Sequence, residues 1–501
     1  MARAEAIASH ESRRWLAFPG LTSTMAAVSC GTLCGFVVLI MSQRPTRWLV
    51  YAPAGLAVVV FTFIGRVPRR RLMTYFIIGL SLNVHYYLTD PERVSYFGNS
   101  SPTYFSVPLV LFPAAALAIW TALDAITGRA HLRWGVPVSK LAVLVIASAI
   151  ISAMLSSSRR YGIYAVVEML QYFFIYLVAV NIVRTKDDLA LVLRLLLVTL
   201  AIQCVIFLVQ TGSGTDFTLT GQIMRSAEGG LIRATGTVGV TSSGYAIFVE
   251  PLVFTAFALW RVRDSDLSRL WTGCLATIGA ATIMLTLNRS SWCTVVLGIS
   301  VVEILCRRRG IARRVSATTT LRVVAIAILA AMIVIPLISA RLEAAHGDDW
   351  NTRKNLMLIA LRMIAGNPIL GVGPGAYPFH LRQYATNNDS DWLWVVHNEY
   401  LLIWSERGLL GFLAWLAWLR SGLRQAVRAT TVKARRFQAF GIGCVAGIVG
   451  LLWEYMLNMW PPYSCYALLW CLLGVLVAGN DIYANAQSSD QLETLATGAS
   501  S

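Results

Sequence analysis

The chain has 501 residues, of which 56% are hydrophobic and only 13% are charged, with a mean hydropathy of +0.62 and a net charge of +17. This composition excludes a soluble globular protein. Lys and Arg form short clusters between apolar runs, a pattern that encodes membrane topology, so we expect no nucleic-acid partner. The nine cysteines lie in or beside apolar runs without a Cys-x-x-Cys pair, and they predict neither a disulfide framework nor a zinc site.

The N-terminal half of the chain predicts an all-α, polytopic membrane bundle. Residues 1–20 form a cytoplasmic segment, and the apolar run that follows is too long for a signal peptide, so it is the first span of a bundle over residues 21–210. Counting apolar runs of about 20 residues gives about 14 spans (12 to 14). Their predicted starts lie near residues 21, 47, 72, 105, 138, 163, 189, 240, 270, 291, 320, 400, 436 and 463.

Topology follows from the basic clusters of the loops. With the N-terminus in the cytoplasm, the clusters at 66–71, 128–135, 307–314 and 420–437 all fall on the cytoplasmic side, as the positive-inside rule requires. Both termini are then cytoplasmic. The polar residues 481–501 predict a disordered cytoplasmic tail.

Two outward-facing connections are long, residues 211–239 and residues 341–399. A loop of that length is either functional or disordered. In the second, Asn351 can cap a helix whose apolar residues recur at 356, 359, 360 and 363, and which ends before Pro368. We therefore expect short helices within an extracytoplasmic loop over 341–399, inside a catalytic region over 211–480.

Histidine is the commonest general base near neutral pH. Of the four histidines that face outward (85, 346, 380 and 397), only His397 directly precedes a predicted span. The helix N-terminus disfavours imidazolium and so favours a neutral, basic ring, although Glu399 acts in the opposite sense. His397, with Asn398 and Glu399, is thus a candidate base, the alternative being a solvated interfacial side chain.

Charged groups at membrane depth mark further candidates. If the span starts near Asn398, Glu406 lies about 12 Å below its start and should pair with a charge on another helix. The short hairpin over residues 286–292 places Arg289 at or below the outer interface, where its planar guanidinium would suit a diphosphate, unless it snorkels to water. Arg233 is a second candidate phosphate ligand.

Weaker candidates complete the set. Arg225 is a weaker phosphate ligand than Arg233, and Arg353 and Arg382 are weaker still. The glycines of GVGPG, residues 371–375, lack the Lys-Ser/Thr and preceding strand of a phosphate loop, so they predict a tight turn. Asp389 and Asp391 have the D-x-D spacing by which many sugar-nucleotide enzymes hold a divalent metal, but they also read as a polar loop.

Together these residues resemble the O-antigen ligase and polymerase superfamily of bacterial membrane glycosyltransferases. The resemblance covers residues 225–475 and rests on IRATGTVG (232–239), LNRSSW (287–292), the GNPILGVGPGAY stretch that ends at 377, and above all HNEYLLIWSERGLLG (397–411). It implies His397 as the essential loop histidine, Arg289 as the essential arginine and Arg233 as a second functional arginine.

The resemblance also implies a reaction. It is an inverting transfer, without a metal or other cofactor, of a glycan from an undecaprenyl-diphosphate carrier to a hydroxyl of a glycan or lipid acceptor, at the periplasmic face of the inner membrane. The sequence does not separate a ligase from a surface polysaccharide polymerase. The alternative from another class is a transporter or flippase for the same lipid-linked glycan.

Overall fold

The computed structural model describes residues 68–88, 105–214, 227–228, 231–239, 241–262, 269–312, 348–386, 394–459 and 462–498. The chain divides into two units, Met1–Arg71 and Leu72–Ser501, and the elements described below belong to the second, apart from the first turn of the first helix. The predicted spans near 21, 47 and 320 lie outside the described residues, as do Arg225, His346 and the D-x-D pair.

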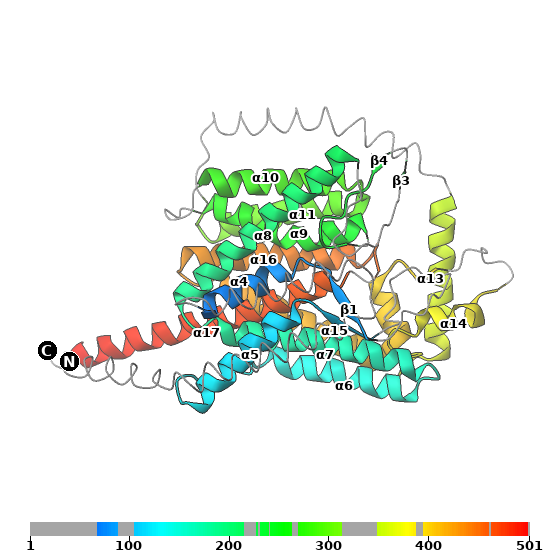
Figure 1. The fold of residues 1–501 in the computed structure, drawn as a ribbon, viewed down its shortest axis with the longest axis horizontal. Coiled ribbons are helices and arrows are strands. Elements are labelled where there is room, and N and C mark those ends of the chain that lie inside the picture. Colours follow the sequence, from blue (N-terminus) through cyan, green and yellow to red (C-terminus); the bar gives the residue numbers. More distant parts are fainter. Residues whose placement is uncertain are drawn as a thin grey trace, which may run out of the picture. The chain divides into compact units, whose positions relative to one another are not determined.

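Helices dominate the described residues (Figure 1). They are α4 (Pro68–Gly79), α5 (Leu111–Ile126), α6 (Val138–Leu155), α7 (Arg159–Ile182), α8 (Lys186–Ser213), α9 (Ser242–Arg261), α10 (Arg269–Leu285), α11 (Arg289–Arg308), α13 (Asp348–Gly366), α14 (Tyr377–Tyr384), α15 (Glu399–Ala429), α16 (Arg435–Glu454) and α17 (Tyr463–Gly498). Seven of these, α6 to α9, α11, α16 and α17, are long and apolar enough to cross a membrane. The protein is therefore an all-α polytopic membrane protein, as predicted.

Two sequence expectations differ from the structure. The span predicted near residue 72 is wrong, because α4 has 12 residues and is followed by a turn, and its length of about 18 Å is too short for a bilayer core of about 30 Å. The tail predicted to be disordered from residue 481 instead continues α17 to Gly498. No proline interrupts this stretch, and its Ala, Gln, Leu and Glu residues are good helix formers.

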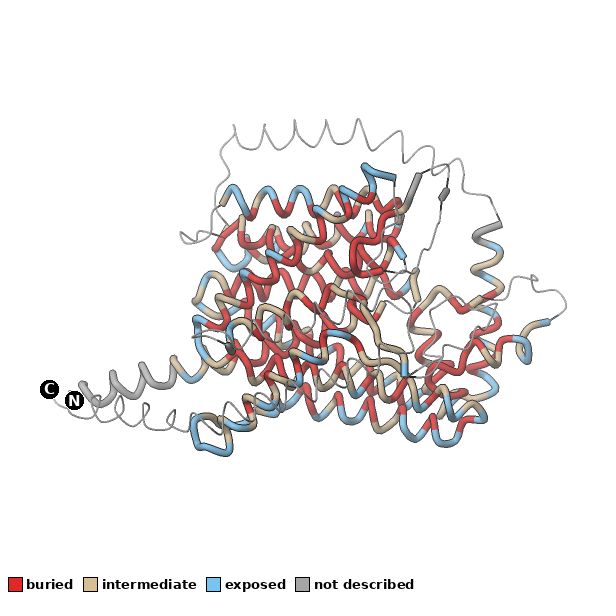
Figure 2. Tube along the Cα trace, viewed as in Figure 1, coloured by how far each residue is buried: buried red, intermediate tan, exposed pale blue. Residues whose placement is uncertain are grey.

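The described helices pack most closely where glycine lies at a contact. On α16, a Cβ at Gly443 would lie 2.5 Å from the Cα of Thr255, and one at Gly447 would lie 2.7 Å from the Cβ of Pro251, both on α9. Small residues allow helices in a membrane to approach closely. Accordingly α9, α16 and α17 are the most buried of the membrane-length helices, and Figure 2 shows burial running along them.

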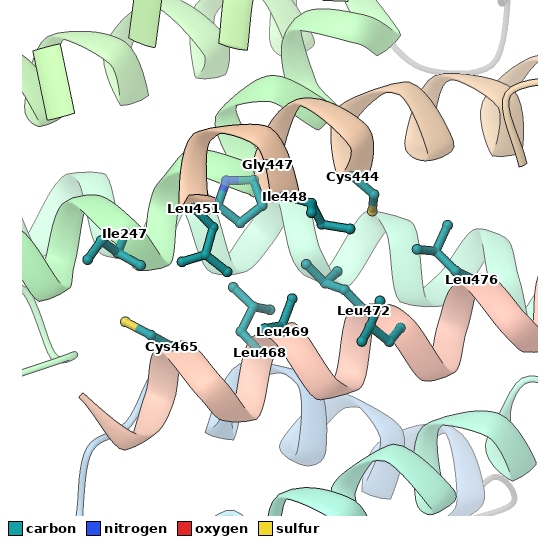
Figure 3. Close-up of a pocket in the computed structure, with 12 residues that line it drawn as sticks. Ile247, Cys444, Gly447, Ile448, Leu451, Cys465, Leu468, Leu469, Leu472 and Leu476 are labelled. Carbon is teal, nitrogen blue, oxygen red and sulfur yellow. The ribbon is translucent and has the colours of Figure 1, made fainter. Parts of the chain in front are cut away.

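A narrow cavity of about 30 Å³ lies between α9, α16 and α17 (Figure 3). Its lining is leucine, isoleucine and proline side chains, Gly447 and the thiols of Cys444 and Cys465. A lining without charged groups cannot hold a phosphate, and the volume is that of about one water molecule. The residues that bind a charged substrate therefore lie outside this cavity.

Within the described residues, two small antiparallel strand pairs, here called hairpins, accompany the helices. β1 (His85–Tyr87) pairs antiparallel with β2 (Ser106–Pro108), with His85 opposite Pro108, and β3 (Ala227–Glu228) pairs with β4 (Leu231–Ile232). Sequence analysis predicts neither hairpin, because strands this short leave no readable alternation of polar and apolar residues.

The described part of the long connection has a hydrophobic core of its own. Along α13 the four positions predicted from the apolar period are all buried, and they pack with Tyr377 and Leu381 of α14 and with Val395 and Val396. This face of α13 is confirmed, and so is its end before Pro368. Its start is not, because α13 begins at Asp348 rather than after Asn351, and acidic residues suit a first helical turn. Figure 1 shows α13 and α14 together at one end of the bundle.

Candidate functional site

The start of α15 is fixed to the turn that follows α16, Tyr455–Asn458, here called the 455–458 turn. Asn398 is the N-cap of α15, and its Oδ1 accepts a hydrogen bond from the backbone N–H of Leu401 at 3.0 Å. Its Nδ2 donates to the carbonyl of Met456 at 3.2 Å, and the backbone N–H of Glu399 donates to the carbonyl of Tyr455 at 2.8 Å. The preceding residue, the half-buried His397, is therefore held beside this turn.

The start of α11 is fixed to the same turn. Arg289 is the first residue of α11 and is exposed. The hydroxyls of Ser290 and Ser291 donate to the two carboxylate oxygens of Glu454, the last residue of α16, at 2.7 and 2.8 Å. The Nδ2 of Asn458 donates to the Ser290 hydroxyl at 3.0 Å. The start of α11, which begins at Arg289, and the start of α15, which His397 precedes, are thus both bonded to one short segment, Glu454–Asn458.

Two further arginines join this region. Arg353 of α13 donates through Nη1 to the carbonyl of Leu457 in the 455–458 turn, at 3.4 Å. Arg233 donates through Nε to the carbonyl of Thr286, three residues before Arg289, at 3.2 Å. Of the arginines singled out from the sequence, Arg353 therefore contacts the 455–458 turn directly, and Arg233 contacts the residues that lead into α11 and Arg289.

The loop that carries Arg233 is buried against α8. Gln203 donates to the Thr237 hydroxyl at 2.6 Å and accepts from the Thr237 backbone N–H at 3.1 Å. Gln210 forms the same kind of pair with the backbone of Gly236, at 3.1 and 2.8 Å. Irregular backbone at membrane depth is stable only where the protein satisfies its polar groups. These two glutamines do so, and they hold the loop in place.

α15 is broken at Gly408, which has φ 64° and ψ −174°. Around the break the residues 368–373, here called the strap, replace the missing helical hydrogen bonds. The strap N–H groups of Val372 and Gly373 donate to the carbonyls of residues 405 and 406 at 2.9 and 2.8 Å, and the N–H groups of Leu409 and Leu410 donate to strap carbonyls 368 and 369 at 2.9 and 3.4 Å. The strap therefore satisfies the backbone on both sides of the break.

The strap is also bonded to α6. Ser152 donates to the carbonyls of Leu370 (2.6 Å) and Glu406 (3.0 Å), and Ser156 donates to that of Val372 at 2.5 Å. The GVGPG stretch that begins in the strap forms a tight turn, as predicted, and all three of its glycines have positive φ. It does not act as a phosphate loop in sequence or in backbone geometry.

These features correct two expectations about Glu406. It is buried, but its carboxylate accepts a hydrogen bond from the backbone N–H of Tyr377 at 3.4 Å, where a cation from another helix was predicted. The expected depth assumed that the span must start near Asn398 in order to cross the bilayer. α15 runs to Ala429, so the part after Gly408 has a length of about 31 Å and can cross the bilayer core by itself.

Two other described histidines, His85 and His380, are engaged elsewhere. His85 of β1 lies between Asn83 Oδ1, 2.8 Å from Nε2, and the Ser106 hydroxyl, 3.0 Å from Nδ1. Because a carbonyl oxygen only accepts, Nε2 carries the proton and Nδ1 accepts from Ser106. Burial lowers the pKa of His85 to about 4, so the ring is neutral, and both of its nitrogens already have hydrogen-bond partners. His380 lies on α14, 3.0 Å from Gln383 and 3.4 Å from Ser157.

Sequence analysis misses the residues that hold this arrangement together: Gln203, Gln210, Ser290, Ser291, Glu454 and Asn458. Glu454 carried a readable signal, since an acidic residue within LLWEYML breaks an otherwise apolar run just as Glu406 does. The glutamines carried none, because an amide in a long apolar helix is common and its partner lies in a distant loop.

Comparison with known proteins agrees with this location. No curated protein matches the chain. Residues 274–416 match the family model for O-antigen ligase. The match runs from α10 into α15 and includes Arg289, Arg353 and the segment His397–Glu399, whereas Arg233 and Glu454 lie outside it. Over residues 274–416 the chain is therefore similar to the O-antigen ligase family, and over these residues the resemblance to the O-antigen ligase and polymerase superfamily is confirmed.

Proposed function

We propose that this protein is a membrane glycosyltransferase that moves a glycan from an undecaprenyl-diphosphate carrier to a hydroxyl group of a glycan or lipid acceptor. The observation that carries the proposal is that the 455–458 turn contacts the start of α11, which begins at Arg289, as well as Arg353 and the His397–Glu399 segment. Arg233 donates to the carbonyl of Thr286, three residues before Arg289. A base and several guanidinium groups in one region are what such a transfer requires.

In this mechanism His397 is the general base. It takes the proton of the acceptor hydroxyl while the acceptor oxygen attacks the anomeric carbon from the side opposite the diphosphate. The new glycosidic C–O bond forms as the bond to the diphosphate oxygen breaks, and the electron pair leaves with the diphosphate. Attack from the opposite side inverts the anomeric configuration. No metal is needed for this step if cationic side chains neutralise the leaving group.

The arginines supply that neutralisation. Arg289 and Arg233 bind the diphosphate, with Arg225 in the same connection, because a guanidinium binds phosphate oxygens through paired, charge-assisted hydrogen bonds. Arg353, which donates to the Leu457 carbonyl of the 455–458 turn, adds a further positive charge to this region. Asn398 and Glu399 hold His397 in place, and Glu406 holds the turn before α14.

The proposed setting is the periplasmic face of a bacterial inner membrane, with both termini in the cytoplasm. A diphosphate on a lipid carrier lies at the membrane surface, so the groups that bind it must lie where spans begin. Arg289 begins α11, and His397 directly precedes α15. Whether the product is joined to a lipid or to another repeat unit decides between a ligase and a surface polysaccharide polymerase.

The test is a transfer assay with purified undecaprenyl-diphosphate glycan and acceptor, in liposomes and with and without EDTA. We expect transfer that survives EDTA and that His397→Ala abolishes, whereas His380→Ala, in the same loop, leaves it unchanged. Product formation by the His397→Ala protein would refute the mechanism. Loss of activity in EDTA would instead point to the D-x-D pair and a metal.

A lipid-linked glycan flippase is the second candidate, because α15 is broken at Gly408 and broken helices are common in transporters. The same liposomes separate the two functions. A flippase would move labelled donor across the bilayer without acceptor and would not depend on His397, whereas the glycosyltransferase forms a new glycosidic product.

A further inference from the structure

We propose that Glu454 is a positioning residue that fixes Arg289 relative to His397. The inference rests on the proposed function, since it concerns the two groups assigned to that reaction. Glu454 itself is fully buried, lies outside the matched O-antigen ligase stretch, and would not touch the substrate.

The carboxylate of Glu454 accepts hydrogen bonds from three side chains at the start of α11 and from Asn458. Its Oε2 accepts from Ser290 at 2.7 Å and from the side-chain amide of Asn458, and its Oε1 accepts from Ser291 at 2.8 Å and from Thr294 at 2.9 Å. Four donors on two oxygens match the full accepting capacity of an ionised carboxylate. Three of the four come from the first two turns of α11, so the orientation of that helix end, and of Arg289 on it, follows Glu454.

The same residue is joined to the other half of the site by the chain itself. Glu454 is followed directly by the 455–458 turn, whose first two carbonyls accept from Glu399 and Asn398 and whose third accepts from Arg353. Within five consecutive residues the protein therefore holds the start of α11, the start of α15 and one end of α13. The helix ends that carry Arg289, His397 and Arg353 are therefore all bonded to one short stretch of chain.

The charge of the residue also suits its place. A carboxylate is stabilised near the positive N-terminal end of a helix, here α11. Glu250 of α9 is buried next to Glu454, and Ser291 contacts both. Negative charge on both carboxyl groups would be repulsive. The donors of α11 that bind Glu454 therefore also stabilise the negative charge on that residue.

The decisive variants exchange donor and acceptor. In Glu454→Gln one of the two accepting oxygens becomes an N–H₂ group, which only donates, so the two donors that face it must turn to accept, and the negative charge is lost. In the double variant Glu454→Gln with Asn458→Asp, the new amide donates to the new carboxylate, and the charge of the cluster is kept. The matched control is Glu303→Gln, which removes a carboxylate from the other end of α11, where it pairs with Arg261 at 2.7 Å and Arg307 at 2.6 Å.

The measurement is kcat and KM for undecaprenyl-diphosphate glycan, together with the melting temperature of each purified protein. We expect Glu454→Gln to lower kcat by about 100-fold, the usual effect of a displacement near 1 Å, with a smaller change in KM. The double variant should recover kcat to within about 5-fold of wild type, and Glu303→Gln should stay within about 3-fold. A merely structural role would change the melting temperature without this selective loss and rescue.

The outcomes separate the two proposals. If the wild-type protein transfers no glycan, the proposed function fails whatever Glu454 does. If the wild type transfers and folded Glu454→Gln has the same kcat, or if the double variant folds but stays inactive, the positioning role is refuted. Should neither variant fold, Ser290→Ala replaces them: it removes one contact to Glu454, and wild-type kcat in that variant would equally refute the role.

Discussion

Gly408→Ala tests whether the break in α15 is required for activity. With φ 64° and ψ −174°, Gly408 is in a region of backbone space open almost only to glycine, and any other residue there is strained by about 1–3 kcal/mol. A Cβ would lie 2.1 Å from the carbonyl oxygen of Ile369 and 2.3 Å from the nitrogen of Leu370. Both are backbone atoms of the strap, which cannot rotate away.

The size of the effect follows from these distances. Moving the Ile369 oxygen from 2.1 Å to an ordinary contact of roughly 3.5 Å shifts the strap by roughly 1.4 Å. Four backbone hydrogen bonds join the strap to α15 around the break, each contributing about 1 kcal/mol. Their loss together with the strain would destabilise the docked strap by roughly 5–7 kcal/mol. The strap leads to α14, and α13 before it carries Arg353, so we expect at least about a 100-fold loss of transfer.

The assay pairs glycan transfer with hydrogen exchange of the strap. Gly408→Ala should lose activity and also lose amide protection at residues 372, 373, 409 and 410. Gly212→Ala is the matched control, because a Cβ at that glycine meets nothing within 4 Å. Wild-type transfer and wild-type protection in Gly408→Ala would show that the break is not held by the strap as described.

Three further predictions concern other parts of the structure. Gln203→Leu leaves the buried backbone N–H of Thr237 without its partner, so it should lower the free energy of unfolding by about 1–3 kcal/mol, measured by thermal melting in detergent; an unchanged melting temperature would contradict this. The folded protein keeps His85 neutral down to a pKa of about 4, whereas the unfolded chain takes up a proton below about pH 6.5, so stability should fall as pH drops from 6.5 towards 4. His85→Gln should show a smaller fall, and equal pH dependence would exclude this origin. Arg233→Ala should raise the KM for the diphosphate donor about 10-fold or more, while Arg194→Ala, exposed on α8, should not.

Helix positions were largely predictable because a bilayer imposes a simple length rule. Apolar runs locate α6 to α11 and α15 to α17 within a few residues of their observed starts, and the 3.6-residue period of α13 identifies its buried face. The rule fails for α4, where an apolar run is shared between a short helix and a hairpin. It fails again at Gly408, since one glycine in a helical pattern does not reveal a break without its distant partner, the strap.

The candidate site was predictable in its reactive groups and not in its supports. Histidine and arginine at the mouths of spans are chemically conspicuous, so His397, Arg289 and Arg233 stand out from sequence, and their assigned roles remain predictions. What brings them together is a set of hydrogen bonds between residues more than 100 positions apart, such as those from Ser290 to Glu454. Such pairs leave no periodic signal in a single sequence, and only the folded chain shows them.

The 455–458 turn has a consequence for engineering. It follows α16 and lies beyond the last residue of the O-antigen ligase match, yet it contacts both the start of α11, through Asn458 and Ser290, and the start of α15, through Met456 and Asn398. In a chimera that exchanges residues 274–416 for those of a relative, the relative's arginine and histidine would be held by this protein's own Glu454 and 455–458 turn. An exchange meant to change specificity should therefore extend past Asn458. The exchanged residues then include the segment that sets the spacing between the start of α11 and the start of α15.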